Sequence, residues 1–278
     1  MNQKQRLLLF LLAISLQLIS AAQTETYTIT KTPFSSDFYD EFAPVYHDNG
    51  LVFCTDRNSG VTDYSTSHNA KFIKIFYIDT SGMKSRPGLL SKYLRTRLND
   101  GPATFNSTGD TVYFSNNLIT QGNLRKISAS RNKLGIFYAV KEGKKWTKIR
   151  EMRFNNEWYN ISTPCLSPNG NRIYFSSDKP DGFGGTDLYY SERKGEYWGD
   201  PVNLGPVINS AGNESYPFIN SGGELFFASD GHPGLGGKDI FYSRMKDGRW
   251  LAPVRLDPPV NSQDRKSTRL NSSHRIRS

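Results

Sequence analysis

The sequence predicts an all-β fold built from small antiparallel sheets that repeat along the chain. Residues 176–198 read SSDKPDGFGGTDLYYSERKGEYW, and residues 228–250, fifty-two positions later, read ASDGHPGLGGKDIFYSRMKDGRW. The two stretches align without a gap. Tyr and Phe occur in short clusters, which is typical of strands, and they form no long helical stripes. A period of about fifty residues indicates a repeat architecture.

The repeated unit occurs about four times. Each copy has two characteristic sequence segments, called here its first and second phrase. The first phrase is a Pro-containing strand, a turn and an apolar-aromatic strand: APVYHDNGLVFCTD at 43, GPATFNSTGDTVYFSN at 101, STPCLSPNGNRIYFSSD at 162 and SYPFINSGGELFFASD at 215. The second phrase is an aliphatic-aromatic strand: IFYID at 75, IFYAVKEGKKW at 136, LYYSERKGEYW at 188 and IFYSRMKDGRW at 240. Trp146, Trp198 and Trp250 close the last three copies at equal spacing.

Each unit is interpreted as four short strands, a to d. In the last unit we expect strand a near Ser215–Ile219, strand b near Glu224–Ala228 and strand c near Asp239–Ser243, with strand d starting near Trp250. Asn-Ser-Gly-Gly and Lys-Asp-Gly are compact turn sequences that join a to b and c to d. The inner strands do not alternate cleanly between apolar and polar residues, which indicates that both of their faces are covered.

Four-stranded sheets that repeat side by side and cover each other's faces are the blades of a β-propeller. A β-sandwich is the alternative, but it predicts no fixed period. We assign residues 37–264 to the propeller. The blades run over about 37–98, 99–150, 151–205 and 206–256, and the start of a fifth lies at 257–264.

Only the first residues of a fifth unit are recognised. LDPPVNSQD at 256 repeats LGPVINSAGN at 204, but the following RKSTRLNSSHRIRS matches no part of the repeat. We interpret 265–278 as a non-native fusion or assembly scar, in preference to a natural basic tail, and expect it to be disordered. Because propellers close with about four to eight blades, we expect an incomplete propeller, an open arc in which the outward face of blade 4 lacks a neighbour.

The N-terminus has the pattern of a secretory signal peptide. A basic start is followed by an apolar run from Leu7 to Ile19 and then by Ser20-Ala21-Ala22. We predict a signal peptide over 1–22 and a linker over 23–36. A membrane anchor is the alternative, but the run is short for a span. The mature chain is therefore expected to be exported, to the periplasm or to the outer membrane, without a transmembrane span.

The net charge of +9 does not indicate nucleic-acid binding. The last fourteen residues hold five Lys or Arg, and Lys4 and Arg6 precede the mature chain, so seven of the nine charges lie outside the repeats. Nucleic-acid binding requires a clustered basic face on the folded domain. Cys54 and Cys165 could form a disulfide in an oxidising compartment. They fall in non-adjacent units, so we favour two buried free thiols.

One stretch resembles a known family. SPNGNRIYFSSDKPDGFGGTDLYY, residues 167–190, is similar to the WD40-like repeat of TolB-type propellers, with Asn169 in place of the Asp of that pattern. The fourth unit is nearly as similar, whereas the first two match only in their strands. The resemblance implies exported envelope proteins of Gram-negative bacteria, which often carry a peptidoglycan-binding OmpA-type domain. No such domain is recognised in this sequence.

The long connections, b–c and d–a, lie on one side of a propeller and are the expected place for binding. This binding face would carry these candidates: Asp178, Asp181, Asp187, Asn209, Asn213, Glu214, Asp230, Asp239 and Asn261. DKPDGFGGTD could supply oxygen ligands to Ca²⁺, but it lacks the EF-hand spacing. We favour a structural role, in which Asp187 and Asp239 accept hydrogen bonds from loop amides, and expect no cofactor.

Catalytic patterns are not recognised. The sequence has no Gly-x-Ser-x-Gly elbow, and His47, His68 and His232 occur singly. Structural roles are predicted for aromatic residues: Phe53, Phe114, Phe175 and Phe227 buried between blades, and Trp146, Trp198 and Trp250 packed within their own blades. The function expected is non-catalytic binding of envelope proteins or cell-wall glycan. The alternative is a glycan-acting hydrolase or a lectin-like glycan-binding propeller.

Overall fold

The computed structural model describes residues 27–57, 72–81, 86–119, 132–143 and 145–263. The chain divides into two units, Met1–Thr30 and Lys31–Ser278, and the fold described below belongs to the second. The predicted signal peptide, His68 and residues 265–278 lie outside the described residues. Among the residues described, no helix has the length and apolarity of a membrane span.

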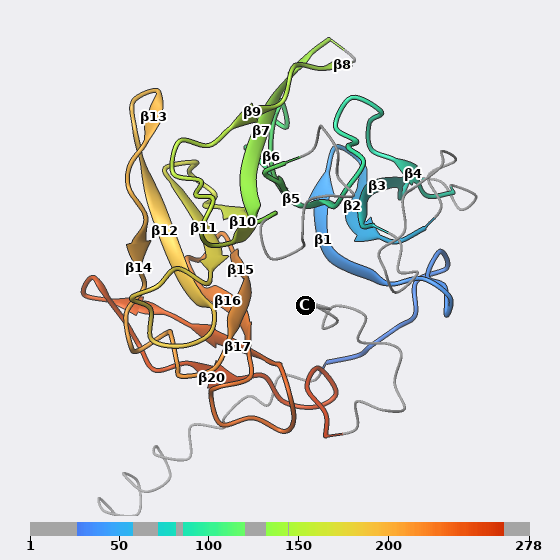
Figure 1. Ribbon diagram of the computed structural model, residues 1–278. Helices are drawn as coiled ribbons and strands as arrows, with labels where there is room; N and C mark the ends of the chain where they lie inside the picture. The colour runs from blue at the N-terminus through green and yellow to red at the C-terminus, as the bar shows by residue number, and fades with distance from the viewer. Residues whose placement is uncertain (1–26, 58–71, 82–85, 120–131, 144, 264–278) are drawn as a thin grey trace, which may run out of the picture. The chain divides into compact units, whose positions relative to one another are not determined.

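The described residues form strands and loops without helices, and the predicted all-β propeller is confirmed (Figure 1). Four antiparallel sheets follow one another along the chain as blades 1 to 4. Blade 1 contains β1 (Glu41–His47), β2 (Gly50–Thr55), β3 (Lys74–Asp79) and β4 (Gly88–Leu89), and blade 2 contains β5 (Asp100–Phe105), β6 (Thr111–Asn117), β7 (Leu134–Glu142) and β9 (Arg150–Glu151). Blade 3 contains β10 (Ile161–Leu166), β11 (Arg172–Ser177), β12 (Asp187–Lys194) and β14 (Val202–Asn203), and blade 4 contains β15 (Glu214–Ile219), β16 (Leu225–Ser229), β17 (Asp239–Ser243) and β20 (Val254–Arg255).

Strand d begins later than the sequence predicted. In blade 4, Val254 and Arg255 pair with Tyr242 and Phe241, whereas Trp250 pairs with Met245 in a separate hairpin of β18 (Met245–Lys246) and β19 (Arg249–Trp250). Blades 2 and 3 have the same arrangement. There β8 (Lys145–Trp146) and β13 (Tyr197–Trp198) are the second strands of the corresponding hairpins. The c–d connection is therefore a hairpin with its own short ladder, because the Gly turn reverses the chain before strand d reaches the sheet.

The Pro-containing strand a carries a β-bulge in every blade. The pairing register with strand b shifts between residues 42 and 45, 100 and 103, 162 and 165, and 215 and 218. Ala43, Thr163 and Tyr216, each followed by Pro, have φ values of 50°, 54° and 53°. Proline has no N–H to donate to the ladder, so it is tolerated in a strand where a bulge releases that position from pairing.

The core lies between consecutive blades. Phe114, Phe175 and Phe227, in strand b of blades 2 to 4, are at most 1% exposed. Phe175 packs with Tyr113 and Ile136 of blade 2, and Phe227 packs with Tyr174 and Leu188 of blade 3. In blade 1, Phe53 is also buried and stacks on Phe34, with ring centroids 5.4 Å apart.

The tryptophans also pack between blades, which differs from the prediction that each packs within its own blade. Trp198 of blade 3 contacts Tyr113 of blade 2, and Trp250 of blade 4 packs on the cluster that includes Tyr174 of blade 3. Trp146 of blade 2 lies 6.3 Å from the ring of His47 of blade 1. The reason is the hairpin described above, which carries each tryptophan past the edge of its own sheet to the preceding blade.

Blades 1 and 4 are not joined by a shared sheet in the described residues. Strand d of blade 4 comes from its own repeat, as β20, and residues 27–30 form no strand. The rings of Phe42 in blade 1 and Tyr216 in blade 4 lie edge to face, 6.1 Å apart. Cys54 and Cys165 are buried and free, as expected. Burial raises the pKa of Cys165 to about 11, so this thiol is unreactive at neutral pH.

Candidate functional site

The predicted binding face holds loops together through its acidic side chains. Asp178, at the end of strand b in blade 3, accepts hydrogen bonds from the backbone and side-chain amides of Asn160. Asp230 accepts the corresponding pair from Asn213 in blade 4. Each bond ties the end of strand b to the residue that precedes strand a. These carboxylates are therefore partnered within the chain.

Asp187 and Asp239 occupy the structural role that was favoured for them. Asp187, which is 1% exposed, accepts the amides of Phe183 at 2.6 Å and Gly184 at 3.1 Å. Asp239, equally buried, accepts the amide of Gly236 at 3.2 Å. These bonds close the Gly-rich b–c loop on the start of strand c. Among the described residues, no group of three His, Cys, Asp or Glu side chains is placed to hold a metal ion.

Three asparagines form one repeated clamp, of which the sequence suggested two. Asn209 accepts the amide of Leu188 at 2.7 Å and donates to its carbonyl at 3.0 Å. Asn261 does the same with Ile240. Asn155 does so with Ile136 in blade 2 and was missed. Its surroundings, RFNNEWYN, differ from VINSAGN, and it lies two residues closer to its tryptophan than Asn209 and Asn261 do, so neither motif nor spacing pointed to it.

Glu214 and Asp181 complete the predicted face and differ in exposure. Glu214 is fully buried and accepts hydrogen bonds from Ser210 and Ser229. Asp181 is exposed and lies 3.4 Å from the ammonium of Lys179. Of the nine predicted binding-face residues, only Asp181 and Asp230 are exposed. The side chains of this face therefore mainly hold loops together through hydrogen bonds.

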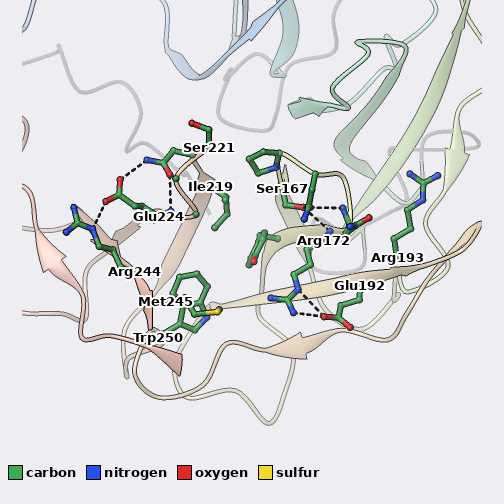
Figure 2. Close-up of a pocket in the computed structure, with 17 residues that line it drawn as sticks. Ser167, Arg172, Glu192, Arg193, Ile219, Ser221, Glu224, Arg244, Met245 and Trp250 are labelled. Atoms are coloured by element: carbon green, nitrogen blue, oxygen red, sulfur yellow. Dashed lines mark hydrogen bonds and ion pairs between the residues drawn. The ribbon is translucent and has the colours of Figure 1, made fainter. Parts of the chain in front are cut away.

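A groove lies at the opposite end of the sheets, between blades 3 and 4 (Figure 2). In antiparallel blades the a–b and c–d turns share one end, away from the b–c and d–a loops. The groove has a volume of about 1180 Å³. Its walls are the two a–b turns, Ser167–Asn171 and Asn220–Glu224, together with the ends of strand c. Met245 and Trp250 come from the c–d hairpin of blade 4.

Two ion pairs line the groove. Arg172 donates to one oxygen of Glu192 through Nε at 3.0 Å and through Nη2 at 2.6 Å. Arg244 donates to Glu224 at 2.5 Å. Both guanidinium groups also lie over tyrosine rings of strand c, Arg172 over Tyr190 and Arg244 over Tyr242. Stacking and bonding together hold each guanidinium in place, so the charged groups of the groove are positioned in advance.

Apolar side chains lie between these pairs (Figure 2). Trp250 is half-buried, Met245 is 41% exposed and Ile219 is buried. The hydrogen bond from Arg244, and then that from Asn220, lower the pKa of Glu224 below its ordinary value. The groove therefore offers an apolar centre, with the Arg172–Glu192 pair on its blade-3 wall and the Arg244–Glu224 pair at its blade-4 rim, on the side of Tyr242. The sequence did not predict this site, because its residues come from two units and from the short turns.

Comparisons with known proteins give structural likeness only. No family model and no curated protein matches the chain. One similar solved structure is a thermostable family-43 glycoside hydrolase, at 13% identity and a TM-score of 0.47, over 81% of this chain and 79% of that one. Another is a putative TolB from Agrobacterium tumefaciens, at 16% identity and a TM-score of 0.45, over 75% of this chain and 61% of that one. Likenesses of this order carry no argument about function.

Proposed function

We propose that this chain is a non-catalytic propeller that binds a protein partner through the groove between blades 3 and 4. The observation that supports the proposal is the composition of the groove. Arg172, Arg244, Trp250 and Met245 are of the residue types that are enriched at protein interfaces. Their charged groups are held by Glu192 and Glu224, so binding needs little ordering of these side chains.

The state of the carboxylates favours binding over glycoside hydrolysis. A glycosidase needs a carboxylic acid that stays protonated near neutral pH, and its pKa is raised for that purpose. Glu224 has a lowered pKa, because Arg244 and Asn220 donate hydrogen bonds to its carboxylate. Glu192 is bound by two nitrogens of Arg172. Glu224 is therefore suited to remain charged, and both groove carboxylates orient arginines.

The partner is expected to be an extended polypeptide segment. Such a segment can place an apolar side chain against Trp250 and Met245 while its own charges meet Arg172 and Arg244. The exposed turn residues Gly222 and Gly223 have no side chain, so a ligand can approach the rim of the groove closely there. The apolar N-terminal run indicates export, so we place the partner in the bacterial envelope, in the periplasm or at the outer membrane.

The proposal is tested by site-specific photo-crosslinking in an envelope fraction of the host. A benzoylphenylalanine at Met245, in the groove, should give a discrete protein adduct that Arg244→Glu removes. The same group at Tyr46, which is 83% exposed on blade 1, is the matched control and should not give that adduct. Retention on isolated cell-wall sacculi without a protein adduct would assign the groove to glycan instead. Turnover of glycoside substrates would contradict the non-catalytic assignment.

A further inference from the structure

The outward face of each blade is the face that the next blade covers. In blade 3 this face carries Tyr174 and Leu188, which are 4% and 0% exposed beneath blade 4. In blade 2 it carries Tyr113 and Ile136, which are 5% and 0% exposed beneath blade 3. Three successive interfaces bury the same positions, because blade 2 likewise covers Val52 and Ile75 of blade 1.

Blade 4 has the same row of side chains on its outward face, and part of that row is less covered there than in blade 3. Phe226 and Ile240 lie fifty-two positions after Tyr174 and Leu188, and both are only partly buried. Phe218, opposite Phe226 on strand a, is 53% exposed. Tyr242 and Val254 continue the row across strands c and d. The blade-4 outward face is defined by these five residues.

The aromatic residues of this face already form a continuous ladder. The ring centroids of Phe218 and Phe226 are 6.2 Å apart, and those of Phe226 and Tyr242 are 5.8 Å apart. The same ladder in blade 3, between Tyr174 and Tyr190 at 6.1 Å, is the surface on which blade 4 packs. A row of three aromatic rings with aliphatic flanks is costly to leave in water.

The connection that leads away from this face is folded as in the covered blades. Asn261 clamps Ile240 through both its amide oxygen and its amide nitrogen, as Asn209 clamps Leu188. In blade 3, the loop that contains this clamp leads directly to strand a of the blade that covers it. Both the surface and its clamp therefore repeat the geometry of a blade-to-blade interface.

We propose that the blade-4 outward face docks a further four-stranded sheet of the same blade type. The occupant would set aliphatic and Phe residues of its strand b against Phe226 and Ile240, as Leu225 and Phe227 lie against blade 3. A hairpin Trp would approach Phe226, as Trp250 approaches Tyr174. A second copy of this chain fits less well, because the corresponding residue of blade 1, Phe53, is already buried and stacked on Phe34.

The first test compares matched substitutions in the chain as it is. Leu188→Ala, beneath blade 4, should lower the Tm by about 4 °C or more. Ile240→Ala, at the same position on the open face, should change the Tm by less than a quarter of that amount. Equal losses would mean that the face is covered within this chain and would overturn the proposal.

The second test supplies the occupant. In a tandem chain, residues 205–256 are repeated immediately after Leu256, so that a blade of the required type follows blade 4. Ile240→Ala in the first copy should now lower the Tm as much as Leu188→Ala does. An unchanged Tm, or an inserted copy that adds no β-structure by circular dichroism, would overturn the proposal. So would dimerisation of the parent chain in sedimentation that Phe226→Ser abolishes, since that result assigns the face to a second copy.

Discussion

The indole of Trp198 in blade 3 stands perpendicular to the ring of Tyr113 in blade 2, with the ring centroids 5.9 Å apart and an interplanar angle of 88°. This is the edge-to-face geometry that aromatic pairs prefer. Trp198 reaches Tyr113 because the c–d hairpin carries it beyond its own sheet. The regularly spaced tryptophans therefore make contacts between blades.

Trp198→Ala should lower the free energy of unfolding by about 2 kcal/mol, since it removes a half-buried ring and its aromatic contact. Urea unfolding followed by circular dichroism measures the change. Trp158, which is 78% exposed, provides the matched control, and Trp158→Ala should shift the free energy by less than about 0.5 kcal/mol. Equal effects of the two substitutions would remove the case for an interblade role.

Phe175→Ala should cost about 3–5 kcal/mol, as do other core Phe→Ala changes. Phe175 is fully buried and stacks on Phe154, with ring centroids 5.1 Å apart. Phe38, at 89% exposure, is the control for loss of a phenyl ring at the surface. An unfolding midpoint for Phe175→Ala within error of the parent would mean that the core lies elsewhere.

Asp187→Ala should destabilise the fold by about 1–3 kcal/mol, because it leaves the amides of Phe183 and Gly184 without their acceptor. Asp181→Ala, on the same loop but exposed, should cost clearly less, and what it costs comes from placing alanine at a φ of 79°. Thermal unfolding of both variants measures the difference. A larger loss for Asp181→Ala would contradict the loop-closing role of Asp187.

The Tm of the parent chain should be the same with added Ca²⁺ as with excess EDTA. The oxygens of Asp187 are occupied by backbone amides and by the side-chain amide of Asn203 at 2.8 Å, so they are not available as ligands. A Tm that rises with Ca²⁺ concentration would show mass-action stabilisation by a bound ion and would overturn the favoured structural role of this loop.

Stability should fall as the pH drops below about 6.5, in part through His47. Burial lowers the pKa of His47, while Asp48 opposes this shift. The imidazole stacks on Phe105 with ring centroids 3.8 Å apart. Because the folded-state pKa lies below the unfolded value, the unfolded chain binds the proton first, and stability is lost as pH falls from 6.5 towards the folded pKa.

The variant His47→Gln should flatten this part of the pH profile. The measurement is the free energy of unfolding of parent and variant at several pH values between 7.5 and the acid limit of folding. The two profiles should run parallel above pH 7 and converge below 6.5. Parallel profiles over the whole range would exclude His47 as a source of the pH dependence.

Elements that depend on local interactions could be predicted from the sequence. Strands a, b and c of blade 4 were predicted within a residue or two, because alternating turns and apolar-aromatic runs are set by neighbouring residues. The period of fifty-two predicted the blade architecture. Burial of Phe114, Phe175 and Phe227 could be expected from their constant place in strand b.

Contacts between the units could not be predicted from the sequence, because they form only when the blades pack. Trp250 was placed at the start of strand d, but the hairpin of β18 and β19 takes it to blade 3. Most residues of the predicted binding face are buried and hold loops together through hydrogen bonds. The groove lies at the other end of the sheets. Arg172 and Arg244 come to line one groove only when two blades pack, since a repeat pattern encodes each blade but not the surface that two blades create together.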